Sequence, residues 1–321
     1  MELTPRRSPQ RPFGLGLNLP YVEGALDGAT PRWPDIRAMA TTAEEVGFDA
    51  LWISDHVGFG DPAGEWTGAW DSWTLLAGLA AVTQRVHLGT YVSAAPYRNP
   101  ALLAKMAETL DEISGGRAIM AIGAGWNRPE FESYNFPWER RFDRFEDALR
   151  IVTQLLRTGE STHDGSRERT RHARLSPRGP RPTGMPVMVG ATGPRMLRLT
   201  AELADDWNAG LRRPEEVEPL IRALDEACAE VGRDPASLTR SAEVLVRTIA
   251  SPDDAPAGER ELRGSPEEIA AQLRRYADLG VGHLQVQLRP NTPAGVRAFG
   301  PVIEDFDRVD GPGQSSSTSS M

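Results

Sequence analysis

The chain is short of cysteine, of lysine and of long hydrophobic runs. Cys228 is the only cysteine in 321 residues, which excludes an intrachain disulfide framework and is typical of a protein from a reducing cytoplasm. No apolar run is long enough to cross a bilayer, so we expect no membrane segment. The first residues, 1–12, are polar and rich in Pro and Arg, without the apolar region of a secretory signal. We therefore expect a cytoplasmic protein.

Positive charge is scarce as well, and arginine carries nearly all of it. The 36 basic residues include a single lysine, Lys105, and the formal net charge is -9. An acidic surface repels phosphate-rich partners, which argues against binding to nucleic acid or to an anionic membrane. The abundance of Arg, Ala, Gly and Pro is what a GC-rich genome encodes, and it bears on which cofactor the host makes.

Several catalytic and binding signatures are missing from the chain. There is no Gly-x-Ser-x-Gly elbow, no P-loop and no strand-linked Gly-x-Gly-x-x-Gly, so hydrolase, NTPase and dinucleotide-binding interpretations lack their markers. The histidines His87, His163, His172 and His283 do not form a metal-ligand spacing with the carboxylates. We therefore expect no metal site.

The chain does contain a regular alternation of two kinds of segment. Short apolar runs, which predict strands, are followed by longer segments with a helical period. Eight β/α units in this order predict a TIM (β/α)8 barrel. The predicted strands cover 13–18, 49–54, 86–92, 117–122, 187–190, 206–208, 239–249 and 282–288. The predicted helices cover 34–46, 71–83, 100–113, 142–158, 194–204, 214–231, 265–279 and 293–307.

We expect one barrel domain over residues 13–308. Residues 159–184, before the fifth strand, show no apolar period and many Arg and Pro, so we interpret them as an extended excursion, or lid, at the top of the barrel. The tails 1–12 and 309–321 are expected to be disordered, and the second is rich in Gly, Ser and Thr.

The reacting groups of a TIM barrel come from the C-terminal ends of its strands and from the loops that follow them. This rule selects Asn18 after the first strand, and Asp55 and His56 after the second. A histidine in that position can donate or accept a proton near neutral pH. The alternative is that His56 only hydrogen-bonds a loop carbonyl.

Two further loops at the same end carry residue types that suit a ligand. Residues 190–195 (GATGPR) follow a strand and open a helix, so backbone N–H groups and the helix N-terminus suit a phosphate, unless this is a tight turn without a ligand. In the loop that starts at Gly123, Trp126 can wall a ring-shaped ligand and Asn127 can bond its polar edge. Glu130 either caps the following turn or takes part in catalysis.

Six segments resemble luciferase-like oxidoreductases, most closely the actinobacterial branch that uses coenzyme F420, a 5-deazaflavin. The resemblance extends in the right order over residues 13–305, and both termini and the excursion match poorly. The segments are 47–56 (GFDALWISDH), 88–92 (LGTYV), 97–100 (YRNP), 110–117 (LDEISGGR), 123–126 (GAGW) and 204–208 (ADDWN).

The resemblance implies a layout for the cofactor and a homodimer. Asp55 and His56 would face the deazaflavin ring, and a non-prolyl cis peptide at Tyr91–Val92 would support the back face of the ring. Asn18 and Asn127 would also contact the cofactor. Its phosphate would be held by Gly190, Ala191, Thr192, Gly193 and Arg195.

The chain departs from the family pattern at Trp126. Deazaflavin sugar-phosphate dehydrogenases of this family have a Glu at that position, and this Glu is their proton donor. The tryptophan argues against that activity and leaves His56 and Glu130 as the candidate catalytic acids.

The function that the resemblance implies is F420-dependent hydride transfer to or from a small organic substrate. The reaction is either reduction of a C=C or C=N bond or oxidation of an alcohol, and the aromatic loop residues favour an apolar or ring-containing substrate. The alternative is a two-component monooxygenase that uses FMNH2 and O2, and a third is a non-catalytic flavin-binding carrier. The excursion would hold the polyglutamate tail of F420 or an acidic substrate through its arginines, which are Arg167, Arg169, Arg171, Arg174, Arg178 and Arg181. The alternative is that the excursion is only a solvated loop.

Overall fold

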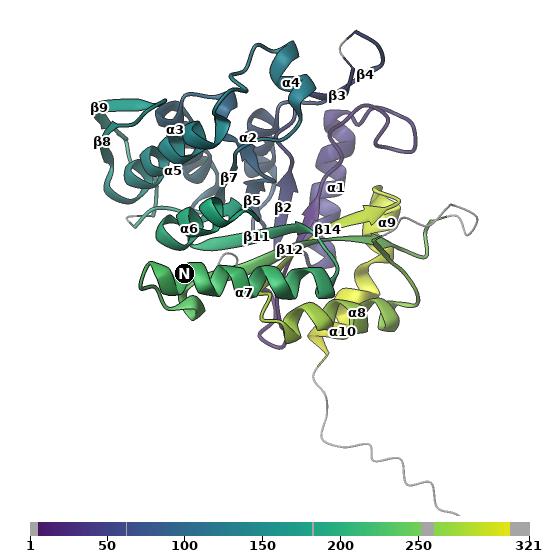
Figure 1. Ribbon diagram of the computed structural model, residues 1–321. Coiled ribbons are helices and arrows are strands. Elements are labelled where there is room, and N and C mark those ends of the chain that lie inside the picture. Colours follow the sequence, from purple (N-terminus) through teal and green to yellow (C-terminus); the bar gives the residue numbers. More distant parts are fainter. Residues whose placement is uncertain (1–5, 62, 182, 252–259, 309–321) are drawn as a thin grey trace, which may run out of the picture.

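The computed structural model describes residues 6–61, 63–181, 183–251 and 260–308. Within these ranges eight parallel strands close into a barrel, each hydrogen-bonded to the next and the last to the first (Figure 1). This closure confirms the predicted TIM barrel. The strands are β1 (Gly14–Asn18), β2 (Ala50–Ile53), β5 (His87–Thr90), β7 (Ala118–Gly123), β10 (Val187–Gly190), β11 (Asp206–Leu211), β12 (Thr239–Arg247) and β14 (His283–Arg289).

Helices cover the outside of the barrel, and most of them begin where the sequence predicts. Asp71 and Asn99 cap the first turns of α2 and α3 with their side chains, and Ser265 forms a capping box with Glu268 at α8. Such caps allow the first residues of a helix to be predicted from the sequence. The helices are α1 (Trp33–Val46), α2 (Ser72–Val82), α3 (Pro100–Ser114), α4 (Arg128–Ser133), α5 (Arg141–Thr158), α6 (Pro194–Leu203), α7 (Pro214–Glu230), α8 (Pro266–Asp278), α9 (Pro293–Ala298) and α10 (Gly300–Asp307).

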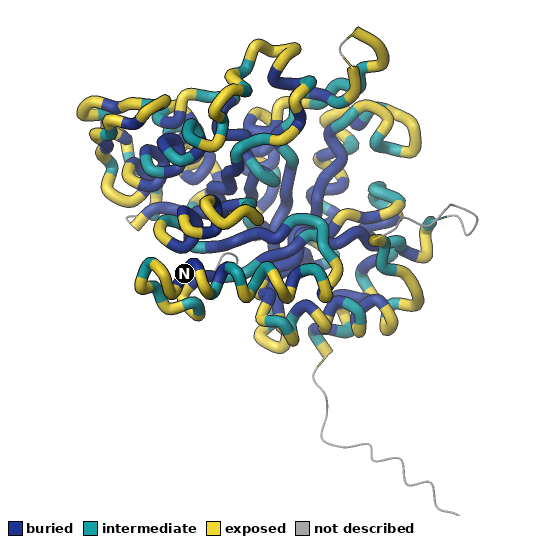
Figure 2. Tube along the Cα trace, viewed as in Figure 1, coloured by how far each residue is buried: buried dark blue, intermediate teal, exposed yellow. Residues whose placement is uncertain are grey.

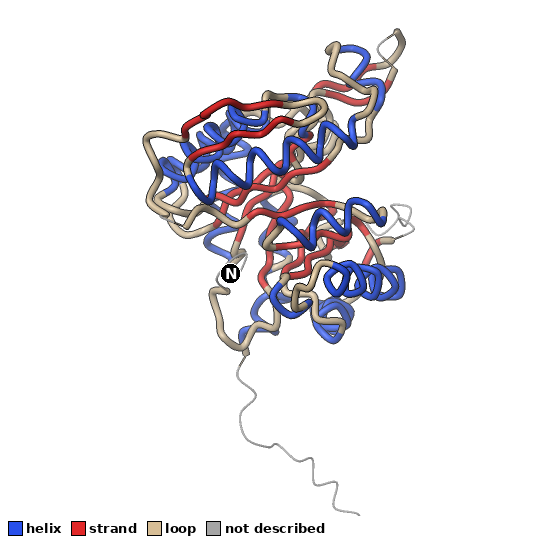
Figure 3. Tube along the Cα trace, turned by 60° about the vertical axis from the view of Figure 1, so that its left-hand side comes forward, coloured by secondary structure: helices blue, strands red, loops and turns tan. Residues whose placement is uncertain are grey.

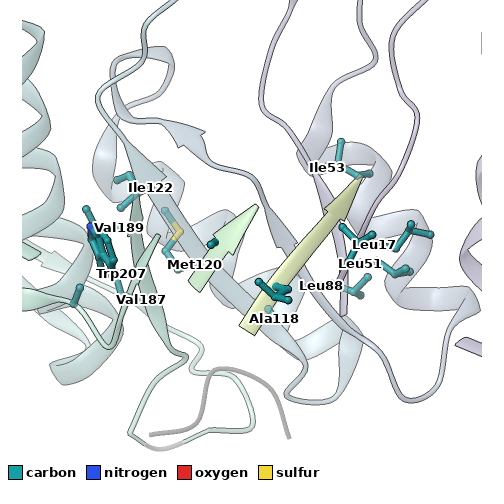
Figure 4. Close-up of a cluster of buried hydrophobic side chains, with 14 of the residues drawn as sticks. Leu17, Leu51, Ile53, Leu88, Ala118, Met120, Ile122, Val187, Val189 and Trp207 are labelled. Atoms are coloured by element: carbon teal, nitrogen blue, oxygen red, sulfur yellow. The ribbon is translucent and has the colours of Figure 1, made fainter. Parts of the chain in front are cut away.

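The main core lies between the strands and this layer of helices. Figure 2 shows that most of the barrel is buried and that most exposed residues lie on the outer faces of helices, in loops and in the β8–β9 segment, residues 160–174. Strand side chains that point toward the helices form a continuous apolar layer, because successive residues of a strand face opposite sides. Figure 4 shows part of this layer, including Leu17, Leu51, Ile53, Leu88, Met120, Ile122 and Val189.

A single tryptophan fills the inside of the barrel. Trp52 on β2 is fully buried, and its indole Nε1 donates to His283 Nε2 at 3.2 Å. The neighbouring strands carry glycines that make room for the ring: a Cβ on Gly16 would lie 2.1 Å from Nε1, and one on Gly89 2.4 Å from Cζ3. Together with Ala50, Ile119, Ala121 and Met188, the indole forms a second small core against which Tyr91 and Val92 pack.

Part of the predicted excursion, residues 160–174, has regular structure that the sequence did not predict. They form a hairpin of β8 (Glu160–Asp164) and β9 (Arg169–Arg174), which lies on the outside of the barrel against α5 (Figures 1 and 3). Its contacts are polar, as when His163 bonds Asp147 of α5 at 3.0 Å, so the segment has no apolar period. Arg178 and Arg181 are ion-paired with acids of α3 rather than free for a ligand.

The N-terminal segment also differs from the prediction of a disordered tail. Within its described part, Arg11 is fully buried and pairs with Asp49 at 2.7 Å and with Asp307 of α10 at 2.7 Å. Two charge-assisted pairs fix the segment against the bottom of the barrel. Residues 1–5 and the predicted disordered tail 309–321 lie outside the described residues.

Smaller differences concern short elements that periodicity does not reveal. The loop after β2 contains a hairpin of β3 (Gly58–Gly60) and β4 (Trp66–Gly68), and the predicted last helix is interrupted at Phe299. Two-residue strands, β6 (Ser93–Ala94) and β13 (Glu261–Leu262), extend the sheet beside β7 and β12. Among the described helices none is long and apolar enough to cross a membrane.

Candidate active site

A cavity of about 660 Å³ opens at the C-terminal mouth of the barrel. This volume lies within the range typical of small-molecule and cofactor sites, and the mouth is where TIM barrels place their chemistry. The lining comes from the ends of β2, β5, β7, β10, β11 and β12 and from the first turns of α5 and α6. Eight of the predicted site residues line it: Asp55, His56, Tyr91, Val92, Gly190, Ala191, Thr192 and Gly193.

The floor of the cavity is the segment that follows β5. The peptide bond between Tyr91 and Val92 is cis, as the resemblance implied. The Tyr91 hydroxyl donates to Asn208 Oδ1 at 2.8 Å, and both residues of the bond rest on the Trp52 core. Burial, followed by the charge of Glu243, raises the pKa of Tyr91 well above its usual value, so the hydroxyl keeps its proton.

Asp55 holds this floor in place from the side. One carboxylate oxygen accepts from Arg98 Nη1 at 2.6 Å and from the Ala94 backbone N–H at 3.2 Å, and the other accepts from the Ser72 hydroxyl at 2.7 Å. The Asp55 carboxylate is therefore fully engaged with the protein. Its place in the cavity wall follows from its position directly after β2.

His56 and Glu130 form a hydrogen-bonded pair at one wall. His56 Nδ1 lies 2.7 Å from Glu130 Oε2, and the imidazole contacts the rings of Phe59 and Trp126 at centroid distances of 4.6 and 5.4 Å. Glu130 is fully buried behind His56 and does not line the cavity. Burial raises the pKa of the Glu130 carboxyl. This effect is outweighed by the hydrogen bond and the charge of His56 and by the backbone N–H groups of Gly58 and Val57, so the pKa of Glu130 lies below its usual value.

The turn after β10 forms the opposite wall. Gly190, Ala191, Thr192 and Gly193 line the cavity directly before α6 begins, and a Cβ on Gly193 would meet nothing within 4 Å. Trp207 Nε1 donates to the Ala191 carbonyl at 2.7 Å and fixes the turn. Open space next to a helix N-terminus gives backbone N–H groups access to an anion.

Three predicted cofactor contacts lie away from the cavity. Arg195 forms ion pairs with Asp143 and Glu146 of α5, both at 2.8 Å, because its position in the first turn of α6 directs it toward that helix. Asn127 is buried and donates to the Gly58 carbonyl at 3.1 Å. Asn18 donates to Glu243 Oε1 at 2.9 Å. Arg195 is thus engaged with α5, and its contact with a phosphate stays a prediction.

Two arginines that the sequence reasoning missed do line the cavity. The Arg141 guanidinium lies 3.9 Å from the ring centroid of Trp138 and 4.3 Å from that of Phe142. Arg212 donates to the neighbouring Leu211 carbonyl at 2.8 Å. Within the described ranges neither is ion-paired with a carboxylate, so both suit an anionic ligand. The one sequence signal for Arg141 was its place where a helix starts after a loop.

Glu243 is a third missed residue and stands among apolar neighbours on β12. It lines the cavity, half-buried, with Asn18 as its hydrogen-bond donor. Burial raises the pKa of Glu243 to about 7, although the bond from Asn18 acts in the opposite direction. An acid in a strand that otherwise reads Ser-Ala-Glu-Val-Leu-Val is the signal that could have identified it. Among the described residues no group of His, Cys, Asp and Glu is arranged to hold a metal ion.

The closed barrel and the cavity at its C-terminal mouth define the class of TIM-barrel enzymes. The chain belongs to the luciferase-like monooxygenase family, whose model matches residues 14–263. It is thereby placed in a family of oxidoreductases.

Relatives with assigned names include reductases from archaea and mycobacteria. The chain is 34% identical over 191 residues to the 5,10-methylenetetrahydromethanopterin reductase of Archaeoglobus fulgidus, which covers 60% of this chain but only 53% of that protein. It is 32% identical over 258 residues to the phthiodiolone/phenolphthiodiolone dimycocerosates ketoreductase of Mycobacterium tuberculosis, covering 74% of this chain and 68% of the ketoreductase. The chain thus spans about half the length of the archaeal relative.

A solved structure has the same fold. The coenzyme F420 dependent tetrahydromethanopterin reductase from Methanopyrus kandleri superposes with a TM-score of 0.76 over 95% of this chain and 100% of that one. The sequence identity is 19%, so this likeness establishes the fold.

Proposed function

We propose that the protein is an F420-dependent oxidoreductase that transfers hydride between the deazaflavin and a small organic substrate. The reaction is reduction of a C=C or C=N bond, or in the reverse sense oxidation of an alcohol. The observation that carries the proposal is that a platform of Tyr91 and Val92 and the open turn from Gly190 to Gly193 line one cavity. The archaeal and mycobacterial relatives, named as reductases, support it.

The residues present fit a ring with a phosphate-bearing side chain. Tyr91 and Val92 would support one face of the ring, and the backbone of Thr192 and Gly193 would bind the phosphate at the start of α6. Arg141 and Arg212 supply the positive charge that Arg195, engaged with α5, does not. When bound, the reduced coenzyme supplies the hydride.

The chain's own residues would contribute a group for proton transfer and an apolar surface at the cavity mouth. His56 is the residue of the cavity wall that we assign to proton transfer with the substrate, because it is held in place by Glu130. Trp126 and Phe142 line the cavity, yet 67% and 43% of their surfaces remain exposed. Exposed aromatic rings at a cavity mouth suit an apolar or ring-containing substrate and displace water from the reacting atoms.

A second candidate is a two-component monooxygenase that uses FMNH2 and O2. The description of the matched family supports it, and the same platform and phosphate-binding turn would accept FMN. The deazaflavin is preferred because Arg141 and Arg212 offer positive charge for the additional carboxylates of F420.

The test is a binding titration of the purified protein with oxidised and reduced F420 and with FMN, followed by absorbance and fluorescence. We expect binding of F420 at micromolar or lower concentration and at least tenfold weaker binding of FMN, a difference of about 1.4 kcal/mol. Tight binding of FMN without binding of F420 would reverse the order of the two candidates. Binding of neither would reject both.

A further inference from the structure

The buried Glu130 carboxylate has four hydrogen-bonding neighbours, and together they determine where a proton sits on His56. Oε1 receives the backbone N–H groups of Val57 and Gly58 at 2.7 and 3.2 Å. Oε2 lies 2.7 Å from His56 Nδ1 and 3.0 Å from the Tyr97 hydroxyl. With four neighbours at two oxygens, a carboxylate uses its full accepting capacity.

An ionised carboxylate only accepts hydrogen bonds, so each of these neighbours has to donate. Hydrogen bonding from His56, Gly58 and Val57 outweighs burial and lowers the pKa of Glu130, so the carboxylate is ionised near neutral pH. Burial, followed by the charge of Glu130, raises the pKa of Tyr97 and keeps its phenol proton in place to donate. The remaining donor is His56, whose Nδ1 must therefore carry hydrogen.

We infer that Glu130 is a positioning residue that fixes neutral His56 as the Nδ1–H tautomer and leaves the lone pair of Nε2 for the cavity. The ring of His56 lies in the cavity wall, and among the described residues only Glu130 makes a hydrogen bond to it. Its ring contacts are with Phe59 and Trp126, neither of which offers an acceptor to the imidazole. Glu130 thus acts on the reaction through His56, although it does not face the ligand.

The consequence, which rests on the proposed function, is a defined direction of proton transfer. In alcohol oxidation His56 Nε2 would accept the proton of the substrate O–H bond as the C=O bond forms, and the oxidised coenzyme, when bound, would take up the hydride of the C–H bond. In the reverse reduction the proton returns from Nε2 of the imidazolium, whose charge Glu130 balances at 2.7 Å. The oxidation therefore needs a proton acceptor at Nε2 of His56, and the reduction needs a proton donor there.

The decisive variant is Glu130→Gln, which keeps the side-chain shape but replaces an acceptor by an amide N–H donor. If Gln keeps its oxygen on the Val57 and Gly58 N–H groups, its NH2 faces His56 Nδ1 and favours the opposite tautomer. The matched control is Glu132→Gln, on the same helix but 60% exposed and paired only with Arg128 in the described part of the chain.

The readout independent of turnover is nitrogen-15 NMR of protein labelled at histidine, with His56 assigned by comparison with His56→Asn. We expect Nδ1–H in the wild type and in Glu132→Gln, and Nε2–H in Glu130→Gln. An Nε2–H tautomer in the wild type at pH 8 would overturn the inference, and this spectrum decides even if Glu130→Gln fails to fold. It needs no cofactor, so a failed F420 titration and a failed tautomer assignment are separate results.

Kinetics then test the consequence with the substrate pair that the enzyme accepts. We expect Glu130→Gln to lower kcat by about 10²- to 10⁴-fold, the usual worth of general acid–base catalysis, with KM changed less than threefold. A Glu130→Gln enzyme with the wild-type kcat would show that the carboxylate is only structural.

Discussion

Glu243 is a carboxyl group placed where water is largely excluded. Its only hydrogen bond from the described residues comes from Asn18, and burial raises its pKa from 4.5 to about 7. The folded protein therefore holds this proton more tightly than the unfolded chain does. Because the unfolded chain releases the proton first as pH rises, Glu243 lowers the free energy of unfolding between pH 4.5 and pH 7.

We predict that Glu243→Gln removes this pH-dependent penalty. The free energy of unfolding of the variant, relative to the wild type, should increase by up to about 3 kcal/mol between pH 4.5 and pH 8, at 1.36 kcal/mol per unit of pKa shift. Urea unfolding of both proteins at the two pH values measures it. A difference that stays constant across this range would mean that the carboxyl titrates normally. Glu132→Gln, exposed on α4, serves as the control and should show no such trend.

Single residues were predictable where their position along the chain fixes their position in space. Asp55 and His56 follow directly after a strand, and the barrel rule alone places them in the cavity wall. The orientation of Arg195 was not predictable, because it depends on acids of α5 that are distant in sequence. Glu243 was missed because a strand residue faces the cavity or the helices according to register, which sequence alone did not settle.

At the scale of elements, β2 and its neighbours are fitted to one indole ring. Strand pairing places Gly89 of β5 opposite Trp52, and Gly16 of β1 lies on the other side. A side chain at either glycine would collide with the indole, so these two strands can lie next to β2 only without a Cβ there. The ring then supports the Tyr91–Val92 platform from below.

Gly89→Ala should therefore destabilise the protein by about 1–3 kcal/mol, the usual cost of overpacking a core, because the new Cβ would lie 2.4 Å from Trp52 Cζ3. Denaturant unfolding measures the loss, and F420 affinity should fall in parallel because the platform is displaced. Gly300→Ala is the matched control, since its Cβ would meet nothing closer than 3.6 Å. Equal stability of the two variants would contradict the packing argument.

Elements with local signals were predictable, whereas those defined by distant partners were not. The helix that starts after Ser265 is marked by its own capping residues, and its predicted and observed bounds agree within two residues. The β8–β9 hairpin has no such mark: its strands pair antiparallel, the hydroxyls of Ser161 and Thr170 bond each other, and Asp147 of α5 accepts from the Arg167 backbone N–H. Its strands are recognisable only once α5 is in place.

At the scale of the whole molecule, the two ends of the described chain are joined by one buried cation. Arg11 bonds Asp49, which precedes β2, and Asp307, which ends α10, while its Nη1 also donates to the Gly47 carbonyl at 2.9 Å. The first and last β/α units are thereby connected beneath the barrel. Closure of the sheet between β14 and β1 and this ion cluster restrain the same junction.

Arg11→Met should lower the free energy of unfolding by about 3–5 kcal/mol, because it leaves the buried carboxylate of Asp49 without its partner. Adding Asp49→Asn should recover part of this loss, since the double variant buries no unpaired charge. Thermal and urea unfolding of the two single variants and the double variant measure the coupling. A loss below about 1 kcal/mol for Arg11→Met would assign the segment a minor role.

The closed sheet itself was foreseeable, since eight alternating units permit few other arrangements. The structure of the N-terminal segment was not predictable, because its composition suggested disorder, whereas in the fold Arg11 pairs with two acids that are distant in sequence.

The tryptophan inside the barrel also affects how ligands reach the cavity. The indole of Trp52 lies below Val92 and closes the base of the cavity, whereas Trp126 and Phe142 line the cavity with much of their surface exposed. Under the proposed function, a coenzyme lying on this base would have to bind before the substrate and be released after it.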